Sequence, residues 1–293
     1  MQDQGRKRSI KTNFLNLFRR ILANPFFERQ LLPWTIDQPI TGLSFKIVPS
    51  HYLYKRGSLR EVNREGIQYL LDISDMVDWY VYYGFLNVAH KKLYQMCDSD
   101  SVVLDIGTNI GSVLLNLSNN AKDGLVIGFE PYPTNYSRCK QNLLLNDAEN
   151  VEVLNLGLGD CITEHRLTIV DPFNLGMTRF DPSNTSGISV PVTTLDQFVS
   201  EKKLQKIDLI KIDVEGFEYK VINGGEKTLT KYQPKLFIEL DDKNLRYQNS
   251  SAYCLIKLLK GLGYTIQNAN DDSMVGLDSD FTNCHFDIIC TPE

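Results

Sequence analysis

The sequence predicts an α/β fold in which helices cover both faces of a mostly parallel sheet. Three observations predict it. Short apolar runs alternate with helical patterns from about residue 100 onward, a glycine-rich turn follows the first run, and acidic residues follow several others. The expected strands are 102–106, 125–129, 151–156, 207–212 and 235–240. The expected helices are 110–119, 134–146, 194–202, 217–231 and 251–262.

Two later segments, 264–267 and 285–290, are expected to complete the sheet as a hairpin-like pair that runs antiparallel to the rest. The result is a doubly wound, Rossmann-like sheet of seven strands. A long insertion, 161–193, precedes the fourth strand, and two extra strands are expected within it at 166–170 and 188–192, around a turn rich in Pro, Asn and Ser.

Residues 1–100 lack the alternation and are expected to form an N-terminal cap region, so that the sheet domain spans 101–293. The cap should contain a strand at 43–48. Its aromatic run, 79–85, is expected to pack between the cap and the core, which we favour over a platform for a sugar ring.

The composition excludes several classes of protein. A net charge of −5 argues against a nucleic-acid partner. The six cysteines form no C-x-x-C pair, and the four histidines form no metal-binding pair, which indicates reduced thiols in a cytoplasmic protein. No apolar run approaches the roughly 20 residues that a membrane span needs.

Basic and apolar side chains recur at helical spacing in residues 6–22, the apolar ones being Ile10, Phe14, Phe18, Ile21 and Leu22. This pattern predicts an amphipathic helix. Such a helix either rests on the inner face of a membrane or docks on its own domain or a partner subunit, and docking is the more common outcome. The expected location is therefore cytoplasmic, with peripheral membrane contact through this segment as the alternative.

The segment 102–111 is expected to form a buried strand, a tight turn and the start of a helix. Asp105 stands two residues before Gly107, and Glu130 follows the next strand. An acid in the position of Glu130 can bind both hydroxyls of a ribose. Asp105 would repel a pyrophosphate at the helix N-terminus and attract a cation. The G-x-x-x-G spacing that ends at Gly111 also differs from the dinucleotide motif, so we predict S-adenosylmethionine rather than NAD or ATP.

Acidic residues near the ends of the fourth and fifth strands are the candidate catalytic groups. Asp213 is the first choice for a general base that accepts a hydroxyl proton, with Glu215 and Glu239 as alternatives. Glu218 is expected to be a favourable charge at a helix N-terminus, and Lys211 to extend from the sheet toward solvent. A Mg²⁺ site formed by Asp213 with Glu239, Asp241 or Asp242 is a further option that we do not favour.

Several motifs together resemble the FkbM-type methyltransferases over about residues 75–290. They are D-I-G-T-N-I-G at 105–111, F-E-P at 129–131, L-G-D at 158–160 and I-K-I-D-V-E-G-F-E at 210–218. The resemblance implies a class I, S-adenosylmethionine-dependent methyltransferase that acts on hydroxyl oxygens. It also implies that Glu130 binds ribose, that Asp160 lies near adenine, and that four residues surround the methionine portion: Asp105, Gly107, Asn109 and Gly111.

The sequence thus predicts an O-methyltransferase for a hydroxyl of a sugar, a glycan or a related metabolite. A polyketide, lipid or protein acceptor remains open. So does a non-catalytic S-adenosylmethionine-binding scaffold in a glycan-biosynthesis complex. The motif D-V-E-G at 213–216 differs from the N/D-P-P-Y of amine-modifying DNA enzymes, which favours a hydroxyl acceptor. The oligomeric state is left undetermined.

Overall fold

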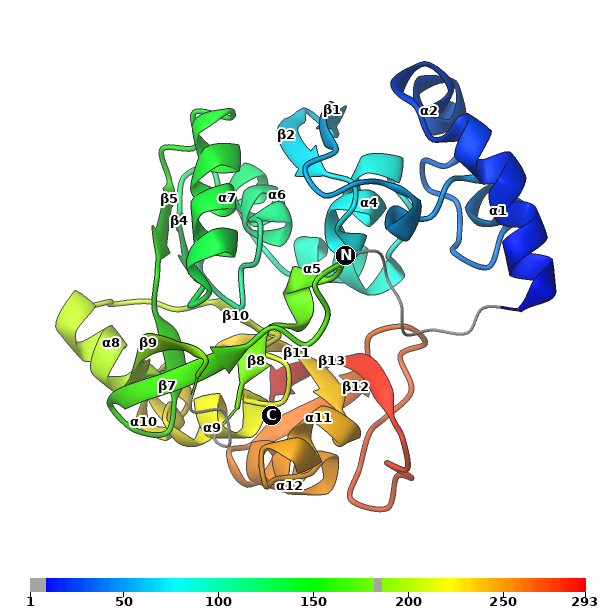
Figure 1. Cartoon of the computed structure of the whole chain (residues 1–293). Coiled ribbons are helices and arrows are strands. Elements are labelled where there is room, and N and C mark those ends of the chain that lie inside the picture. Colours follow the sequence, from blue (N-terminus) through cyan, green and yellow to red (C-terminus); the bar gives the residue numbers. More distant parts are fainter. Residues whose placement is uncertain (1–8, 182–185) are drawn as a thin grey trace. The chain divides into compact units, whose positions relative to one another are not determined.

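The computed structural model describes residues 9–181 and 186–293, which belong to two compact units (Figure 1). The N-terminal unit comprises residues 1–87 with 171–176, and the sheet unit comprises 88–170 with 177–293. The division into domains expected at residue 100 stays a prediction.

The sheet unit contains a seven-stranded sheet in the order β12-β13-β11-β10-β3-β4-β5. Five of its strands are parallel neighbours, and their order reverses direction between β3 and β10, as in a doubly wound Rossmann-like sheet. The predicted fold class is therefore confirmed. The strands are β3 (Val102–Ile106), β4 (Leu125–Phe129), β5 (Val151–Leu154), β10 (Leu209–Ile212), β11 (Lys235–Asp241), β12 (Tyr264–Asn268) and β13 (His285–Pro292).

The last two strands differ from expectation in one respect. β13 is antiparallel to both of its neighbours, β11 and β12. Consequently β12 runs in the same direction as the parallel strands, and only β13 is reversed. This reversal places the start of β13 beside the end of β11, where predicted site residues lie.

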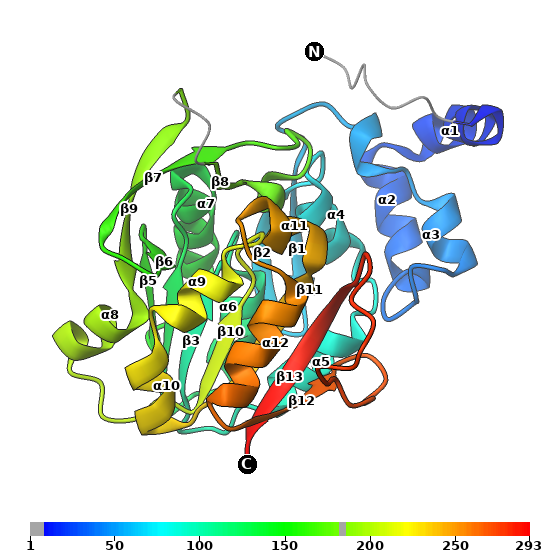
Figure 2. The same cartoon turned by 90° about the horizontal axis from the view of Figure 1, so that it is seen from below.

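Helices cover both faces of the sheet (Figure 2). One apolar cluster joins the sheet to α5, α6 and α7, and a second joins its other face to α8, α9, α10 and α12. The helices are α5 (Val88–Gln95), α6 (Ser112–Asn120), α7 (Pro133–Leu144), α8 (Leu195–Lys202), α9 (Glu218–Asn223), α10 (Glu226–Tyr232), α11 (Asp242–Tyr247) and α12 (Ala252–Gly261). Among the residues that the structure describes, none of the helices is long and apolar enough to cross a bilayer.

The prediction of one helix over 217–231 is wrong, because two short helices, α9 and α10, occupy this range. Gly224 and Gly225 separate them. A Cβ on Gly224 would lie 2.0 Å from the carbonyl oxygen of Gly159, so the backbones approach too closely for any other residue. This contact, together with the low helix propensity of glycine, explains the break.

The insertion before β10, together with β6 just before it, forms a second sheet of four strands in the order β6-β9-β7-β8. Both strands expected in the insertion are confirmed as β7 and β9. The strands are β6 (Gly157–Gly159), β7 (Thr163–Thr168), β8 (Arg179–Phe180) and β9 (Ile188–Thr194). The Pro/Asn/Ser-rich turn expected between them lies partly outside the described residues.

The N-terminal unit combines short helices with one hairpin. The prediction of a strand at 43–48 is wrong, because residues 43–47 form helix α3. This helix begins after Gly42 and ends before Pro49. A short apolar run does not distinguish a strand from a helix by periodicity, and proline disfavours a helical residue before it. The elements are α1 (Ile10–Leu22), α2 (Pro25–Leu31), η1 (Leu32–Trp34), α3 (Leu43–Ile47), η2 (His51–Leu53), β1 (Leu59–Arg64), β2 (Ile67–Asp72) and α4 (Met76–Tyr83). The short helix η3 (Leu175–Met177) begins in the later segment of this unit, residues 171–176.

The aromatic run of this unit is mainly structural. Trp79 and Tyr83 lie one turn apart on α4, are buried, and have ring centroids 5.2 Å apart. The Tyr83 hydroxyl lies 3.1 Å from that of Tyr54. The interpretation as packing rather than as a sugar platform is therefore supported within this unit.

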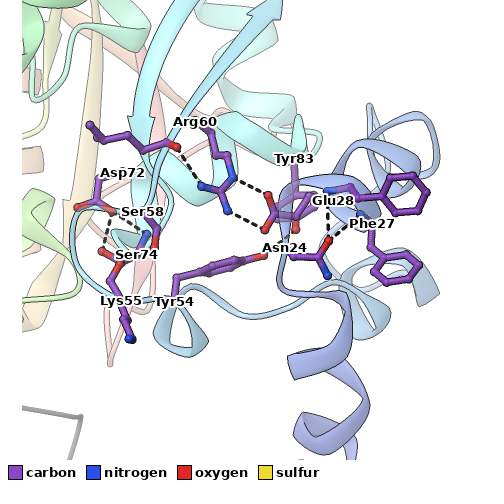
Figure 3. Close-up of polar contacts among 12 residues, drawn as sticks. Asn24, Phe27, Glu28, Tyr54, Lys55, Ser58, Arg60, Asp72, Ser74 and Tyr83 are labelled. Atoms are coloured by element: carbon purple, nitrogen blue, oxygen red, sulfur yellow. Dashed lines mark hydrogen bonds and ion pairs between the residues drawn. The ribbon is translucent and has the colours of Figure 1, made fainter.

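An ion pair with a buried carboxylate joins α2 to the hairpin (Figure 3). The Arg60 guanidinium donates to both carboxylate oxygens of Glu28, at 2.6 and 3.0 Å. At the start of α2, the Asn24 side chain accepts hydrogen bonds from the backbone N–H groups of Phe26 and Phe27. The bidentate pair and this N-cap together fix the position and the first turn of α2.

Candidate functional site

The turn between β3 and α6 is held by a carboxylate. Gly107 and Asn109 have φ of +87° and +53°. The N–H of Asn109 donates to Glu130 at 2.7 Å, and the N–H of Tyr132 donates to the other oxygen of the same carboxylate at 2.9 Å. A Cβ on Gly107 would lie 1.8 Å from the carbonyl oxygen of Asp213. The structure thus brings the glycine turn, Glu130 and the end of β10 together, as the sequence predicts.

Gly111 has a packing requirement of its own. Its φ is +84°, and a Cβ there would lie 2.7 Å from the Sγ of Cys139 on α7. Any side chain would push the turn away from α7. This contact explains the glycine without a ligand, so the methionine contact predicted for Gly111 stays a prediction.

Lys211 occupies the centre of the site. In the sheet, Lys211 of β10 pairs with Asp105 of β3. Its Nζ lies 3.2 Å from Asp105 Oδ1 and 3.6 Å from Asp213 Oδ2, and it donates a hydrogen bond of 2.7 Å to the carbonyl oxygen of Gly107. The side chain of Lys211 is only 3% exposed and that of Asp105 is fully buried. The expectation that Lys211 extends to solvent is therefore wrong, because a buried carboxylate needs a nearby cation.

This pair also alters the electrostatic interpretation of Asp105. Burial raises the pKa of Asp105, although Lys211 opposes the change. Burial alone would lower the pKa of Lys211, but the carboxylates of Asp105 and Asp213 outweigh it and raise that pKa. Lys211 therefore stays protonated and already provides Asp105 with a cation. Attraction of a ligand cation by Asp105 stays a prediction.

The three predicted catalytic residues gather at one point. The ligand atoms of Asp213, Glu215 and Glu239 all lie within 4.8 Å of one another. Ile212 pairs with Ile238 in the sheet, so Asp213 and Glu239 follow at the same level of neighbouring strands. Glu215 enters from the turn after β10 with φ of +54°, and its carboxylate accepts a hydrogen bond of 2.8 Å from the Asn244 side chain. We call these three residues the acid cluster.

Asp242 does not belong to the acid cluster, contrary to the option considered for Mg²⁺. It is buried at the start of α11, where it accepts hydrogen bonds from the N–H of Ala252 at 2.9 Å and from Arg246 at 2.5 Å. Asp241 caps α11 by accepting from the N–H of Asn244. Both residues thus have structural roles at the helix terminus.

Crowding of carboxylates changes their proton affinity. Burial, followed by the charges of Glu239 and Asp213, raises the pKa of Glu215 to about 9. Burial and the charge of Asp213 also raise the pKa of Glu239. Asp287, which faces Glu239 across the strand pair, has its pKa raised to about 7 by burial and by Asp213 and Glu239. The site therefore retains protons near neutral pH.

Three residues near the acid cluster were not predicted as site residues from the sequence. His285 lies opposite Asp241, with Nε2 3.1 Å from Glu239 Oε1, and this contact raises its pKa to about 9. Asp287 is two residues further along β13. Their alternate spacing on a reversed final strand was the available signal. His90 of α5 gave no such signal, and its pKa is lowered to about 4 by burial and by Lys211.

Two other predicted residues have local roles. Glu218 is buried, and one of its oxygens accepts hydrogen bonds from the N–H groups of Val214 and Gly216, at 3.0 and 3.1 Å, so it shapes the turn that carries Glu215. Asp160 is exposed after β6, beside the backbone of Gly224 at the end of α9. No contact between Asp160 and Glu130 follows from this placement. The contact of Asp160 with adenine stays a prediction.

Comparison with known proteins identifies a family. The model of the methyltransferase FkbM domain matches residues 105–266. The 2-O-methyltransferase NoeI of Sinorhizobium fredii is 27% identical over 187 residues, which cover 54% of this chain and 70% of NoeI. The hexuronic acid methyltransferase AglP of Haloferax volcanii is 28% identical over 141 residues, which cover 47% of this chain and 56% of AglP.

Among solved structures, the chain is similar to methyltransferase FkbM from Methylobacillus flagellatus KT. The TM-score is 0.44 and the sequence identity is 18%. The match covers 66% of this chain and 44% of that one.

Replacing Lys211 with methionine should strongly destabilise the protein. The variant leaves Asp105 buried without a cation, a change that typically costs about 3–5 kcal/mol. Urea unfolding of Lys211→Met measures this loss, and Lys122→Met, at an exposed lysine, is the control. The double variant Asp105→Asn/Lys211→Met should recover part of the stability. Equal stability of Lys211→Met and the unchanged protein would contradict the structural role.

Thermal stability should fall as the pH rises from about 6 to about 9. The pKa values of Glu215 and Glu218 are raised to about 9 and about 8, so in this range the folded state binds more protons than the unfolded state. Each kcal/mol lost lowers Tm by about 2–4 °C in a domain of this size.

Differential scanning calorimetry at several pH values tests this dependence. Glu215→Gln should show a smaller fall in Tm, because its amide does not titrate. Glu164→Gln, at an exposed position on β7, should behave like the unchanged protein. A Tm that rises over this pH range would show that the acid cluster does not hold its protons in the folded state.

Proposed function

The chain belongs to the FkbM methyltransferase family, and from this premise we propose that it transfers a methyl group from S-adenosylmethionine to a hydroxyl of a sugar or glycan. One observation carries the proposal. Glu130 closes the glycine turn on one side of the reversal point between β3 and β10, and the acid cluster lies on the other side. Ligands of doubly wound sheets bind at such reversal points.

The residues present fit S-adenosylmethionine. Each oxygen of Glu130 accepts one backbone hydrogen bond and has a second lone pair for a ribose hydroxyl. Because Gly107 lies against the carbonyl oxygen of Asp213, this position of the turn has room for backbone but not for a side chain. Acidic side chains outnumber the single lysine around it, so the site lacks the positive charge that a phosphate would require.

When bound, S-adenosylmethionine supplies an electrophilic methyl group to an acceptor oxygen. The task of this chain is to bind and orient the two substrates, exclude water and take up the hydroxyl proton. Correct orientation alone is worth about 7–11 kcal/mol of a barrier. Glu130 and the glycine turn would orient the donor, and the acid cluster would face the acceptor.

Asp213 is the general base that the geometry favours. Its side chain is 41% exposed, whereas that of Glu239 is 18% exposed. Glu215, with its pKa raised to about 9, is protonated at neutral pH and cannot accept a proton. Lys211 Nζ lies 3.6 Å from Asp213 Oδ2, so a cation stands beside this carboxylate. Asp213 would accept the hydroxyl proton as the acceptor oxygen bonds to the methyl carbon.

The acceptor class is inferred from the relatives and from the site. NoeI is named as a 2-O-methyltransferase and AglP as a hexuronic acid methyltransferase. Carboxylate oxygens accept hydrogen bonds from hydroxyls, so the acid cluster suits an acceptor rich in hydroxyls. We therefore favour a sugar hydroxyl over a polyketide, lipid or protein acceptor, and over a scaffold without catalysis.

A divalent cation is the second candidate for activating the hydroxyl. Carboxylate oxygens are the ligands that Mg²⁺ prefers, and those of Asp213, Glu215 and Glu239 lie within 4.8 Å of one another. A cation there would lower the pKa of a bound hydroxyl and replace Asp213 as the means of activation. We keep Asp213 as the first choice, because its carboxylate is 41% exposed and can reach an acceptor hydroxyl directly.

Calorimetric titration with S-adenosylmethionine should show saturable binding that depends on Glu130. Glu130→Ala removes the ribose acceptor and frees the turn, so the affinity should fall at least about tenfold. Asp123→Ala changes an exposed acid at the other end of β4 and should bind like the unchanged protein. A folded, unchanged protein that does not bind S-adenosylmethionine would refute the proposed function.

Asp213→Asn should reduce kcat about 10²–10⁴-fold and leave the affinity for S-adenosylmethionine unchanged. Turnover is measured as release of S-adenosylhomocysteine. A panel of monosaccharides and hexuronic acids is first screened for an acceptor that supports turnover, and the variants are then compared on that acceptor. Asp123→Asn is the control. Unchanged turnover in Asp213→Asn would exclude this residue as the base, and a loss of turnover in EDTA that Mg²⁺ restores would favour the cation.

A further inference from the structure

Helix α1 has an unusual orientation on the N-terminal unit. Two of its polar side chains, Asn16 and Arg19, face the unit and are both buried at 7% exposure. Arg19 donates to the carbonyl oxygen of Lys46 at 2.6 Å and to the Ser50 hydroxyl at 3.2 Å. The Asn16 amide lies 3.4 Å from the hydroxyl of Tyr52. Two buried polar side chains therefore anchor helix α1 to the unit.

The apolar side chains of α1 point the other way. Four of them, at spacing i, i+3, i+4 and i+7, form one stripe and are 55–64% exposed: Phe14, Leu17, Phe18 and Ile21. Phe14 and Phe18 contact each other edge to face, with centroids 5.4 Å apart. We call these four residues the α1 stripe. An amphipathic helix of a globular protein normally buries such a stripe, so this one is available for a partner.

Exposed apolar residues continue beyond α1 in the same unit. Phe26 of α2, Trp34 of η1 and Leu43 of α3 are all more exposed than any residue of the α1 stripe. Of the 23 large apolar side chains that are exposed among the described residues, 11 belong to residues 14–47. Trp and Phe are the residues typical of segments that insert at the interface between water and lipid.

Charge distinguishes this segment from the rest of the chain. Residues 1–36 contain seven Lys and Arg and two acids, a net charge of +5 within a chain of net charge −5. Both acids are distant from the α1 stripe in sequence, and Glu28 is paired with Arg60. Lys11, Arg20 and Arg29 are exposed. Basic side chains beside an apolar stripe are complementary to anionic lipid headgroups over an acyl layer.

We propose that the α1 stripe docks on the surface of an anionic lipid bilayer, with its apolar side chains at the acyl boundary and the basic residues at the headgroups. A second copy of this chain is less suitable, because it would bring two strongly basic segments together. The proposal is independent of the proposed methyl transfer. Docking on its own unit and contact with a membrane were alternatives for this helix. In the structure, α1 docks on its own unit through polar side chains and leaves its apolar stripe exposed.

Vesicle flotation with the full chain tests the proposal. The protein should float with vesicles of phosphatidylcholine and phosphatidylglycerol, bind much less to phosphatidylcholine alone, and dissociate as salt is added. The double variant Phe14→Ser/Phe18→Ser should lose binding at least about tenfold. The matched control is Leu144→Ser/Leu145→Ser, which alters two exposed leucines at the end of α7 and should bind normally.

Two results would overturn the proposal. One is equal binding by the Phe14→Ser/Phe18→Ser variant and the unchanged protein, with circular dichroism showing the same helix content. The other is a failure of the unchanged protein to bind anionic vesicles. If sedimentation velocity then showed a dimer that Phe14→Ser/Phe18→Ser dissociates, the stripe would be an interface between copies of this chain.

Discussion

The buried charge of Lys211 is the constraint on which the rest of the site depends. Asp105 lies inside the sheet with no exposed surface, and Lys211 on the neighbouring strand is its cation at 3.2 Å. The same ammonium holds the carbonyl of Gly107 and approaches Asp213. Since an unpaired buried carboxylate is costly, β3 and β10 must be neighbours in this register for the turn to form. One side chain therefore couples the glycine turn, the sheet and the acid cluster.

The acid cluster has the opposite character, because like charges are brought together there. Neighbouring parallel strands end at the same level, so Asp213 and Glu239 meet, and the strained turn at Glu215 adds a third carboxylate. Raised pKa values are the consequence. Clusters of this kind reduce stability and are found at sites where proton transfer or cation binding takes place. The arrangement is hard to explain as packing alone.

The N-terminal unit follows a different principle. Polar contacts of Arg19 and the bidentate pair of Arg60 with Glu28 hold α1 and α2, whereas many large apolar side chains of residues 14–47 are exposed. Composition alone would assign these apolar residues to a core. Their exposure shows that amphipathicity predicts a helix but does not determine which face is buried, because a buried guanidinium with enough acceptors can replace apolar packing.

Local sequence patterns were sufficient to predict the sheet, the glycine turn and the identity of the acids that meet, because strand alternation and the position of strand ends are local properties. The tertiary structure decided what depends on partners distant in sequence. It buried Lys211 against Asp105, brought His285 to Glu239 on a reversed strand, and placed Gly224 against the backbone of Gly159 where α9 and α10 are divided. Pairing, burial and close backbone contacts arise only when separate segments pack, so no local pattern contains them.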